Sequence, residues 1–127
     1  MSTLNLRNGS KTQRDGLRGE RIALWYLRFH GYRLLERNYR IGHKEIDLIV
    51  RKGNTVAFVE VKARRSFDGI RPMASVDYRK RKNIIAASRY YIAASRLSRV
   101  VFRYDIIEVN LKSLQVTHII NAYYAGI

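Results

Sequence analysis

Three acidic residues and a lysine lie close together in an otherwise apolar part of the chain. Two short apolar runs, separated by a turn, contain Glu45, Asp47, Glu60 and Lys62. Carboxylate oxygens are the ligands that hard divalent cations prefer, and a nearby lysine can stabilise negative charge that develops during a reaction. These residues can act together only if the fold brings their side chains to one place.

The turn between the two runs predicts how they pair. Gly53-Asn54 suits a two-residue hairpin loop, because both residue types tolerate the positive φ that such a loop requires. A loop of this length places Asp47 opposite Glu60. It also places Glu45 opposite Lys62, and all four side chains share one face because side chains alternate along a strand. Directly opposed Cβ atoms lie ~5 Å apart.

Apolar residues occupy both faces of this hairpin, so we expect protein to cover both. The face with the four charged residues also carries Ile49, Val56 and Phe58. The other face carries Ile46, Leu48, Val50, Ala57, Val59 and Val61. The charged residues are therefore expected at the edge of an interior.

Two interpretations of this arrangement stay open. In the structural one, the strands have charged edges, and Glu45 forms a weak cross-strand ion pair with Lys62. That interpretation leaves Asp47 facing Glu60, and two opposed carboxylates in a partly buried site need a shared proton or a positive charge between them. A hard divalent cation meets this need. A three-residue loop would instead place Asp47 and Glu60 on opposite faces.

The spacing from Asp47 to Glu60-Val61-Lys62 resembles the Asp…(Asp/Glu)-x-Lys signature of the restriction-endonuclease-like, or PD-(D/E)xK, nuclease superfamily. Several motifs between Gly16 and Val109 together resemble more closely the YraN-like family of small predicted endonucleases, akin to archaeal Holliday junction resolvases. They are Gly19-Glu20, Arg37-Asn38-Tyr39-Arg40, Glu45-Ile46-Asp47-Leu48-Ile49, Phe58-Val59-Glu60-Val61-Lys62-Ala63-Arg64, Val76 with Lys80, and Arg103-Tyr104-Asp105. At position 44 this chain has lysine where the family usually has glycine.

The resemblance implies an α/β fold, a restriction-endonuclease-like sandwich with a mixed central sheet flanked by helices. It also implies a nuclease in which Asp47 and Glu60 bind Mg²⁺ or Mn²⁺ and a metal-activated water cuts DNA, branched or single-stranded. Lys62 would stabilise the hydroxide or the charge on phosphorus. Glu45 would either orient Lys62 or complete the metal shell. Glu20 would assist as an outer ligand, although on its own an acid in a first helical turn is better explained by the helix dipole.

The composition favours a polyanionic partner. The 127 residues include 25 Lys and Arg against 10 Asp and Glu, a net charge of +15, which makes nucleic acid the first candidate. The chain has no cysteine, which excludes disulfides and thiolate metal sites and fits a cytoplasmic location. No apolar run approaches the length of a membrane span, so we expect no membrane partner. The sequence does not distinguish DNA from RNA as the partner, or a monomer from a homodimer.

The order of elements predicts a basic mobile arm over residues 1–15 and a single domain over 16–127. A helix over 17–30 should turn Leu17, Leu24 and Leu27 inward, with Glu20 on the same face. A second helix, capped by Ser75 and running from Val76 to about Leu97, should follow a loop over 63–74. Its expected inner face consists of Ile84, Ile85, Ser88, Tyr91, Ile92 and Ser95.

Three further strands are expected around the central hairpin. They cover residues 32–39, 100–109 and 114–120. The strand, helix, strand order from Glu60 through the second helix to Val100 predicts a parallel crossover. Arg103 and Asp105 are expected to form a structural ion pair or a contact at the end of the sheet, and not to take part in catalysis. The three histidines, at 30, 43 and 118, are too far apart in sequence to indicate a histidine metal site.

Basic residues around the site are candidate phosphate contacts. From Arg64 to Arg103 the chain has eleven basic residues and only two acidic ones, although a solvated helix face would also be basic. The candidates are Arg37, Arg40, Arg64, Arg79, Lys80, Lys82, Arg89 and Arg96. Two other classes of function remain: a noncatalytic nucleic-acid-binding protein that keeps the fold, and a basic scaffold on a ribonucleoprotein.

Overall fold

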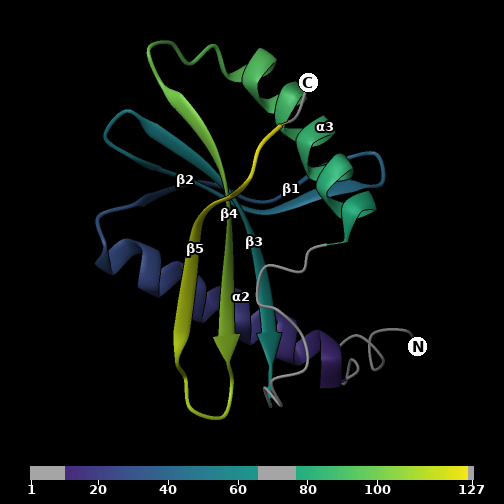
Figure 1. The fold of residues 1–127 in the computed structure, drawn as a ribbon, viewed down its shortest axis with the longest axis vertical. Helices are drawn as coiled ribbons and strands as arrows, with labels where there is room; N and C mark the ends of the chain where they lie inside the picture. The colour runs from purple at the N-terminus through teal and green to yellow at the C-terminus, as the bar shows by residue number, and fades with distance from the viewer. Residues whose placement is uncertain (1–10, 66–76, 126–127) are drawn as a thin grey trace, which may run out of the picture.

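The computed structural model describes residues 11–65 and 77–125, which form two helices and five strands (Figure 1). Helix α2 precedes three strands, and helix α3 separates them from the last two, as the sequence predicts. The elements are α2 (Lys11–Phe29), β1 (Arg33–Ile41), β2 (Lys44–Lys52), β3 (Thr55–Arg64), α3 (Tyr78–Ser95), β4 (Val101–Asn110) and β5 (Val116–Tyr123).

The five strands form one mixed sheet in the order β1-β2-β3-β4-β5. The pairs β1–β2, β2–β3 and β4–β5 are antiparallel, whereas β3 and β4 are parallel. Parallel neighbours need a long crossover connection, and α3 lies in it. The predicted mixed α/β sheet and its parallel crossover are therefore confirmed.

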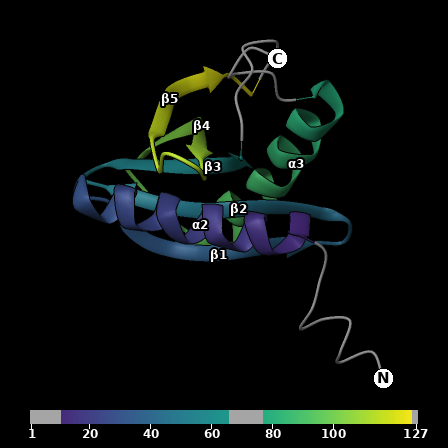
Figure 2. The ribbon, with the colours of Figure 1, turned by 90° about the horizontal axis from the view of Figure 1, so that it is seen from below.

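Each helix covers a different face of the sheet (Figures 1 and 2). On β3, Ala57 and Val59 pack in the cluster beneath α2, while Val56 and Phe58 pack in the cluster beneath α3. This alternation explains why the central strands are apolar on both sides. The α2 cluster is centred on Ala23, Leu24, Leu27, Leu48, Val50 and Ile107; the α3 cluster on Ile49, Phe58, Ile84, Ala87, Tyr104 and Ile106.

Helix α2 begins at Lys11, six residues earlier than predicted. Residues 11–15, which the sequence analysis places in a basic arm, are therefore helical, and residues 1–10 lie outside the described part of the chain. Asp15, one turn into the helix, accepts two hydrogen bonds of 2.9 Å from Arg65, the residue after β3. The prediction that Leu17 faces inward is also wrong, because its side chain is 55% exposed.

Helix α3 is capped by Asp77, whose carboxylate accepts a hydrogen bond from the backbone N–H of Arg79 at 3.4 Å. The predicted cap, Ser75, and most of the predicted loop lie outside the described residues. The inner face is as expected, with Ile84 and Ser88 buried and Tyr91 partly buried. Across the described residues, neither helix is long and apolar enough to cross a membrane.

Candidate functional site

The site lies where strands β2 and β3 separate. Their paired positions run from Lys52↔Thr55 to Leu48↔Val59, which confirms the two-residue loop. Asp47 is the next residue, and its Oδ2 accepts a hydrogen bond from the backbone N–H of Val61 at 2.8 Å. The carboxylate thus takes a position that a backbone carbonyl would hold in a regular sheet. Asp47 is beside Glu60, but the ladder no longer pairs them.

A local change in β1 and β2 accompanies this separation. Asn38 of β1 lies between the pairs Arg37↔Leu48 and Tyr39↔Ile46, so it faces Asp47, and it has a φ of 50°. Beyond this point Ile46 packs beneath α3, although Leu48 packs beneath α2. The prediction that both share one face is wrong, because regular alternation breaks at Asp47. The break brings this carboxylate within reach of both helices.

Glu60 is buried beside α3 with incomplete compensation for its charge. Its side chain is 3% exposed, and its Oε2 lies 2.6 Å from the Nζ of Lys80. Its Oε1 is buried and has no hydrogen-bond partner among the described residues. Buried polar atoms are usually satisfied, so an open carboxylate oxygen marks a place that a ligand can complete. Lys80, predicted as a phosphate contact, has an acidic partner inside the site.

Asp47 and Glu60 affect each other's charge. Burial and the negative charge of Glu60 raise the pKa of Asp47 to about 7, against the opposing effects of the Val61 amide and Lys80. The pKa of Lys80 is raised as well, because the attraction of Glu60 outweighs its desolvation. A strongly perturbed acid in a hollow is typical of functional sites.

Glu20 of α2 reaches the same site from the other face of the sheet. Both of its carboxylate oxygens accept hydrogen bonds from the Nδ2 of Asn38, at 3.2 and 3.4 Å. Burial and the negative charge of Asp47 raise its pKa. Gly19 makes this approach possible, since a Cβ at that position would overlap with the side chain of Ala63 on β3. The Gly-Glu motif therefore has a steric reason for its glycine.

Glu45 and Lys62 lie at the edges of the site. The Oε2 of Glu45 is 3.3 Å from the Nη2 of Arg40, so Arg40 is an ion-pair partner here. Lys62 is half-buried, and it shares the α3 face of β3 with Glu60 because the two are separated by one residue. Arg64 forms an ion pair of 3.3 Å with the buried Glu108.

A hollow of about 320 Å³ opens onto two of the site acids, Glu45 and Asp47. It is lined by residues from the start of β2 and the start of α3, which are His43, Glu45, Asp47, Asp77, Arg79, Lys80, Asn83 and Ile84. Within residues 11–65 and 77–125, no three His, Cys, Asp or Glu side chains form a ready-made metal site. The protein alone offers a cation the two carboxylates of Asp47 and Glu60, and water or a substrate would supply the other ligands.

The predicted basic stripe on α3 is exposed, but it divides between two sides of the helix. Arg79 lines the acidic hollow, whereas Lys82 and Arg89 line a second hollow. Arg96 caps the helix with a left-handed conformation. Arg37 is exposed on β1, and its positive charge partly offsets the raised pKa of Glu20.

Asn38 is a site residue that the sequence reasoning did not select. It lies in the motif Arg37-Asn38-Tyr39-Arg40, of which only the two arginines were considered. The available signal was an Asn within a strand, because Asn adopts positive φ more readily than most residues. Its role follows from both properties: its backbone bends β1, and its side chain holds Glu20.

These features define a small mixed α/β protein with an acidic hollow at a strand fork and a basic surface around it. The model of the family described as "Uncharacterised protein family UPF0102" matches residues 19–109. The chain therefore belongs to the UPF0102 family. All the site carboxylates discussed above, from Glu20 to Glu60, fall within the matched region.

Bacterial relatives cover most of the chain. A UPF0102 protein of Clostridioides difficile is 41% identical over 105 residues, which are 83% of this chain and 92% of that protein. A UPF0102 protein of Caldanaerobacter subterraneus is 41% identical over 110 residues, covering 83% of this chain and 90% of the relative. The family's extent and that of this chain therefore largely coincide.

The solved structure of Pyrococcus furiosus SfsA in complex with Ca²⁺ is 18% identical to this chain, with a TM-score of 0.38. The match covers 84% of this chain and 62% of that protein, so the chain spans less than two thirds of its length. At this level of similarity the comparison carries no argument about function.

Proposed function

We propose that this protein is a divalent-metal-dependent nuclease with a restriction-endonuclease-like fold, acting on structured or branched DNA. The observation that carries the proposal is the uncompensated acidic pair at the strand fork. Glu60 is buried with an open Oε1, and the pKa of Asp47 is raised by burial and by Glu60. Two such carboxylates are stabilised by a cation placed between them.

Mg²⁺ or Mn²⁺ suits these ligands. The available donors are carboxylate oxygens, which hard divalent cations prefer over the nitrogen and sulfur ligands of zinc sites. Mg²⁺ usually keeps several waters and is held by one or two carboxylates together with substrate phosphates, so two protein ligands are sufficient. When bound, the ion would activate a water and neutralise charge on the phosphate.

The surrounding residues of the chain would position and stabilise the reacting groups. The Val61 amide fixes the carboxylate of Asp47 by a hydrogen bond of 2.8 Å. Lys62, half-buried on the face of Glu60, would stabilise negative charge that develops on the phosphate. Glu20, held by Asn38, would act as an outer acid beside Asp47. Arg79 borders the hollow, where it can contact a neighbouring phosphate.

The experiment is a cleavage assay on branched, nicked, single-stranded and duplex DNA, and on matched RNA, with Mg²⁺, Mn²⁺ or EDTA. We expect cleavage of at least one DNA substrate with metal and none with EDTA. Glu60→Gln should abolish cleavage yet bind DNA as well as the parent or better, because it removes a negative charge near the phosphate. Glu36→Gln, an exposed acid on β1, is the matched control. Cleavage that persists in EDTA or in Glu60→Gln would overturn the proposal.

A noncatalytic nucleic-acid-binding protein is the second candidate, and one contact favours it. The ammonium of Lys80 lies 2.6 Å from Glu60 and supplies one positive charge that the carboxylate pair requires. This alternative predicts salt-sensitive binding without metal-dependent turnover. If the folded parent binds nucleic acid but cuts no substrate with either metal, this candidate replaces the nuclease.

A further inference from the structure

A second hollow lies on the other flank of α3. Its volume is about 530 Å³, and its lining joins the first half of α3 to the residues that end β5. Figure 1 shows the yellow end of β5 running up to α3, so these two distant parts of the sequence lie side by side. The side chains that matter for the argument are Tyr78, Arg81, Lys82, Arg89, Tyr123 and Tyr124.

Three tyrosines give this hollow a wall of aromatic rings. Tyr78 and Tyr124 are 71% and 75% exposed, so two large ring faces lie open to solvent. Tyr123 is 6% exposed and forms the inner part of the wall. Exposed rings beside positive charges are how proteins without base-pair readout bind unpaired nucleotides, because every base can stack on them.

Three basic residues occupy the same hollow, and two already lie over its rings. The guanidinium carbon of Arg81 is 5.2 Å from the ring centre of Tyr123, and the Nζ of Lys82 is 5.4 Å from that of Tyr78. Of the described residues, none that lines the hollow is acidic. The first hollow, by contrast, is lined by three acids. The second hollow therefore presents positive charge to an anionic ligand, with no acidic side chain among its described lining residues.

Two buried polar atoms in the wall lack partners. The Nε of Arg81 and the hydroxyl of Tyr123 are buried and make no hydrogen bond within the described part of the chain. Burial, together with the negative charge of Glu60, raises the pKa of Tyr123, so its hydroxyl stays protonated and available as a donor. Both residues line the hollow, so its wall contains donor groups that the described protein leaves without partners.

We propose that this second hollow binds an unpaired nucleotide of a nucleic-acid strand. Its base would stack on Tyr78 or Tyr124, and its phosphate would lie among Arg81, Lys82 and Arg89. The inference rests on the proposed function in taking nucleic acid as the ligand. It adds a site outside the acidic hollow and names the substrate class, a strand with a single-stranded end or branch.

The positions of the two hollows on α3 predict the path that a bound strand would take between them. Lys80 and Asn83 line one flank of α3, and Lys82 and Arg89 line the other. With 3.6 residues per turn, these sets point in roughly opposite directions, about one helix diameter of ~10–12 Å apart. A strand held in the second hollow would continue around the start of α3 to the acids at the fork. Cleavage should therefore fall near the junction of single-stranded and double-stranded DNA.

The test is fluorescence anisotropy with a labelled oligothymidylate and a blunt duplex of equal length, in EDTA so that no cleavage intervenes. Tyr124→Ala and Arg89→Ala are the lining variants. Tyr90→Ala, which changes another exposed tyrosine of α3 that lies outside the hollow, and Arg18→Ala on α2 are the matched controls. Loss of one stacking partner should weaken oligothymidylate binding by about 5- to 100-fold. Duplex affinity should stay within about twofold, and both controls should bind like the parent.

Lining variants that bind oligothymidylate like their controls would overturn the inference. An equal loss of affinity for the duplex would also overturn it, because it would indicate general phosphate contacts. The same holds if thymidine monophosphate competes as strongly as the oligomer, because that would indicate a mononucleotide site. Melting curves establish that each variant is folded. The binding assay contains no metal, so its result is independent of cleavage. If the parent never cuts DNA but the lining variants lose oligothymidylate affinity, this inference is supported and the nuclease is rejected. If the parent cuts DNA but the lining variants bind oligothymidylate as tightly as the parent, the nuclease is supported and this inference is rejected.

Discussion

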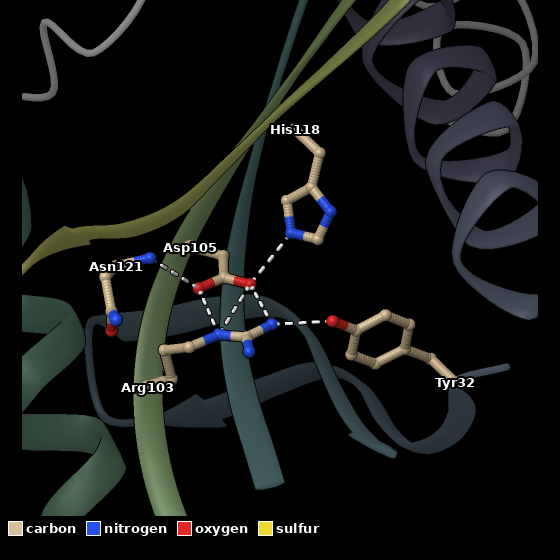
Figure 3. Close-up of polar contacts among 5 residues, drawn as sticks. All are labelled: Tyr32, Arg103, Asp105, His118 and Asn121. Carbon is tan, nitrogen blue, oxygen red and sulfur yellow. Dashed lines mark hydrogen bonds and ion pairs between the residues drawn. The ribbon is translucent and has the colours of Figure 1, made fainter. Parts of the chain in front are cut away.

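The sheet contains two groups of buried carboxylates that differ in how far their charge is compensated. Asp105 on β4 is fully buried, and both of its oxygens accept hydrogen bonds from Arg103 at 2.8 to 3.2 Å (Figure 3). His118 and the backbone N–H of Asn121 donate to it at 2.8 and 3.1 Å. Arg103 also donates to the hydroxyl of Tyr32 at 2.7 Å, which ties β4 to the segment after α2.

The acids at the strand fork have far fewer partners. Asp47 accepts one bond from the Val61 amide, and Glu60 has Lys80 on one oxygen and an open second oxygen. The pKa values respond in opposite directions. Burial would raise the pKa of Asp105, but hydrogen bonds from His118 and Arg103 outweigh it and lower that pKa. Burial and Glu60 raise the pKa of Asp47 to about 7.

The difference separates two reasons for burying an acid. A carboxylate whose oxygens are all satisfied by the protein holds the fold together and has nothing left to offer a ligand. A pair left short of positive charge destabilises the metal-free protein, and such a cost is typical of sites that bind or react. By this criterion the Asp105 group is structural, and the Asp47–Glu60 pair has the features of the functional site that we propose.

The largest expected effect is on folding stability, from one substitution made in both groups. Asp105→Asn should lower the free energy of unfolding by ~3–5 kcal/mol at pH 7, because it removes a fully buried carboxylate and leaves the partly buried guanidinium of Arg103 without its counter-charge. Asp47→Asn makes the same chemical change, yet in EDTA it should leave the free energy of unfolding unchanged or raise it, since it removes one of two repelling charges. Urea unfolding measures both. Equal losses in the two variants would break the comparison.

The next effect is on cleavage and concerns Lys62. Lys62→Met keeps most of the apolar stem but removes the charge, so cleavage should fall by ~10²–10³-fold, the scale for loss of one transition-state stabiliser. Metal binding and DNA binding should persist, because this lysine does not bind the ion directly. Lys112→Met, exposed between β4 and β5, is the control. A metal-replete Lys62→Met protein that cuts at the parental rate would show that the proposed mechanism is wrong.

The third effect is stabilisation by the ion. Mn²⁺ or Mg²⁺ should stabilise the parent by mass action, by ~2.7 kcal/mol at a hundred times Kd. Asp47→Asn and Glu60→Gln should lose most of this stabilisation, while Asp15→Asn, whose partner is Arg65, should keep it. Melting temperatures across a metal titration measure the effect. If the ion stabilises Asp47→Asn and the parent equally, it binds elsewhere.

Much of the fold could be predicted from local patterns. Gly53-Asn54 determines the hairpin register, and the apolar runs on both faces of β2 and β3 indicate a covered sheet, because both signals depend only on neighbouring residues. The start of α2 could not be predicted in this way. It depends on Asp15 meeting Arg65, fifty positions further along the chain, and no local pattern records such a contact.

The site was predicted in composition but not in detail. Asp47 and Glu60 do lie together, but regular alternation does not predict that β2 breaks its pattern at Asp47, opposite Asn38 and its positive φ on the neighbouring strand. Lys80 lies at the border of the apolar face of α3, which predicts that it can reach toward the sheet, and it is also a candidate phosphate contact. Its partner in the sheet, Glu60, could not be predicted, because this contact depends on how α3 packs over β3.

The smallest expected effect is the pH dependence that follows from the opposite pKa shifts. The folded pKa of Asp47, about 7, lies above its unfolded value of ~3.9, so its protonated form favours the folded state and that contribution is lost as pH rises through 7. In EDTA, Asp47→Asn should therefore gain stability relative to the parent between about pH 4 and 7 and stay level above. The gain should be on the order of 1 kcal/mol, because Lys80 offsets part of the repulsion between the two carboxylates. The pH dependence of Asp105 has the opposite sign. Its pKa in the folded state lies below its pKa in the unfolded state, so its charged form stabilises the fold at higher pH. The loss of stability caused by Asp105→Asn should therefore become smaller as the solution is acidified below about pH 4. Thermal melts of the parent and both variants from pH 2 to 8 measure these slopes, and parallel curves for the two variants would mean that the fork holds its acids as tightly as the Asp105 group does.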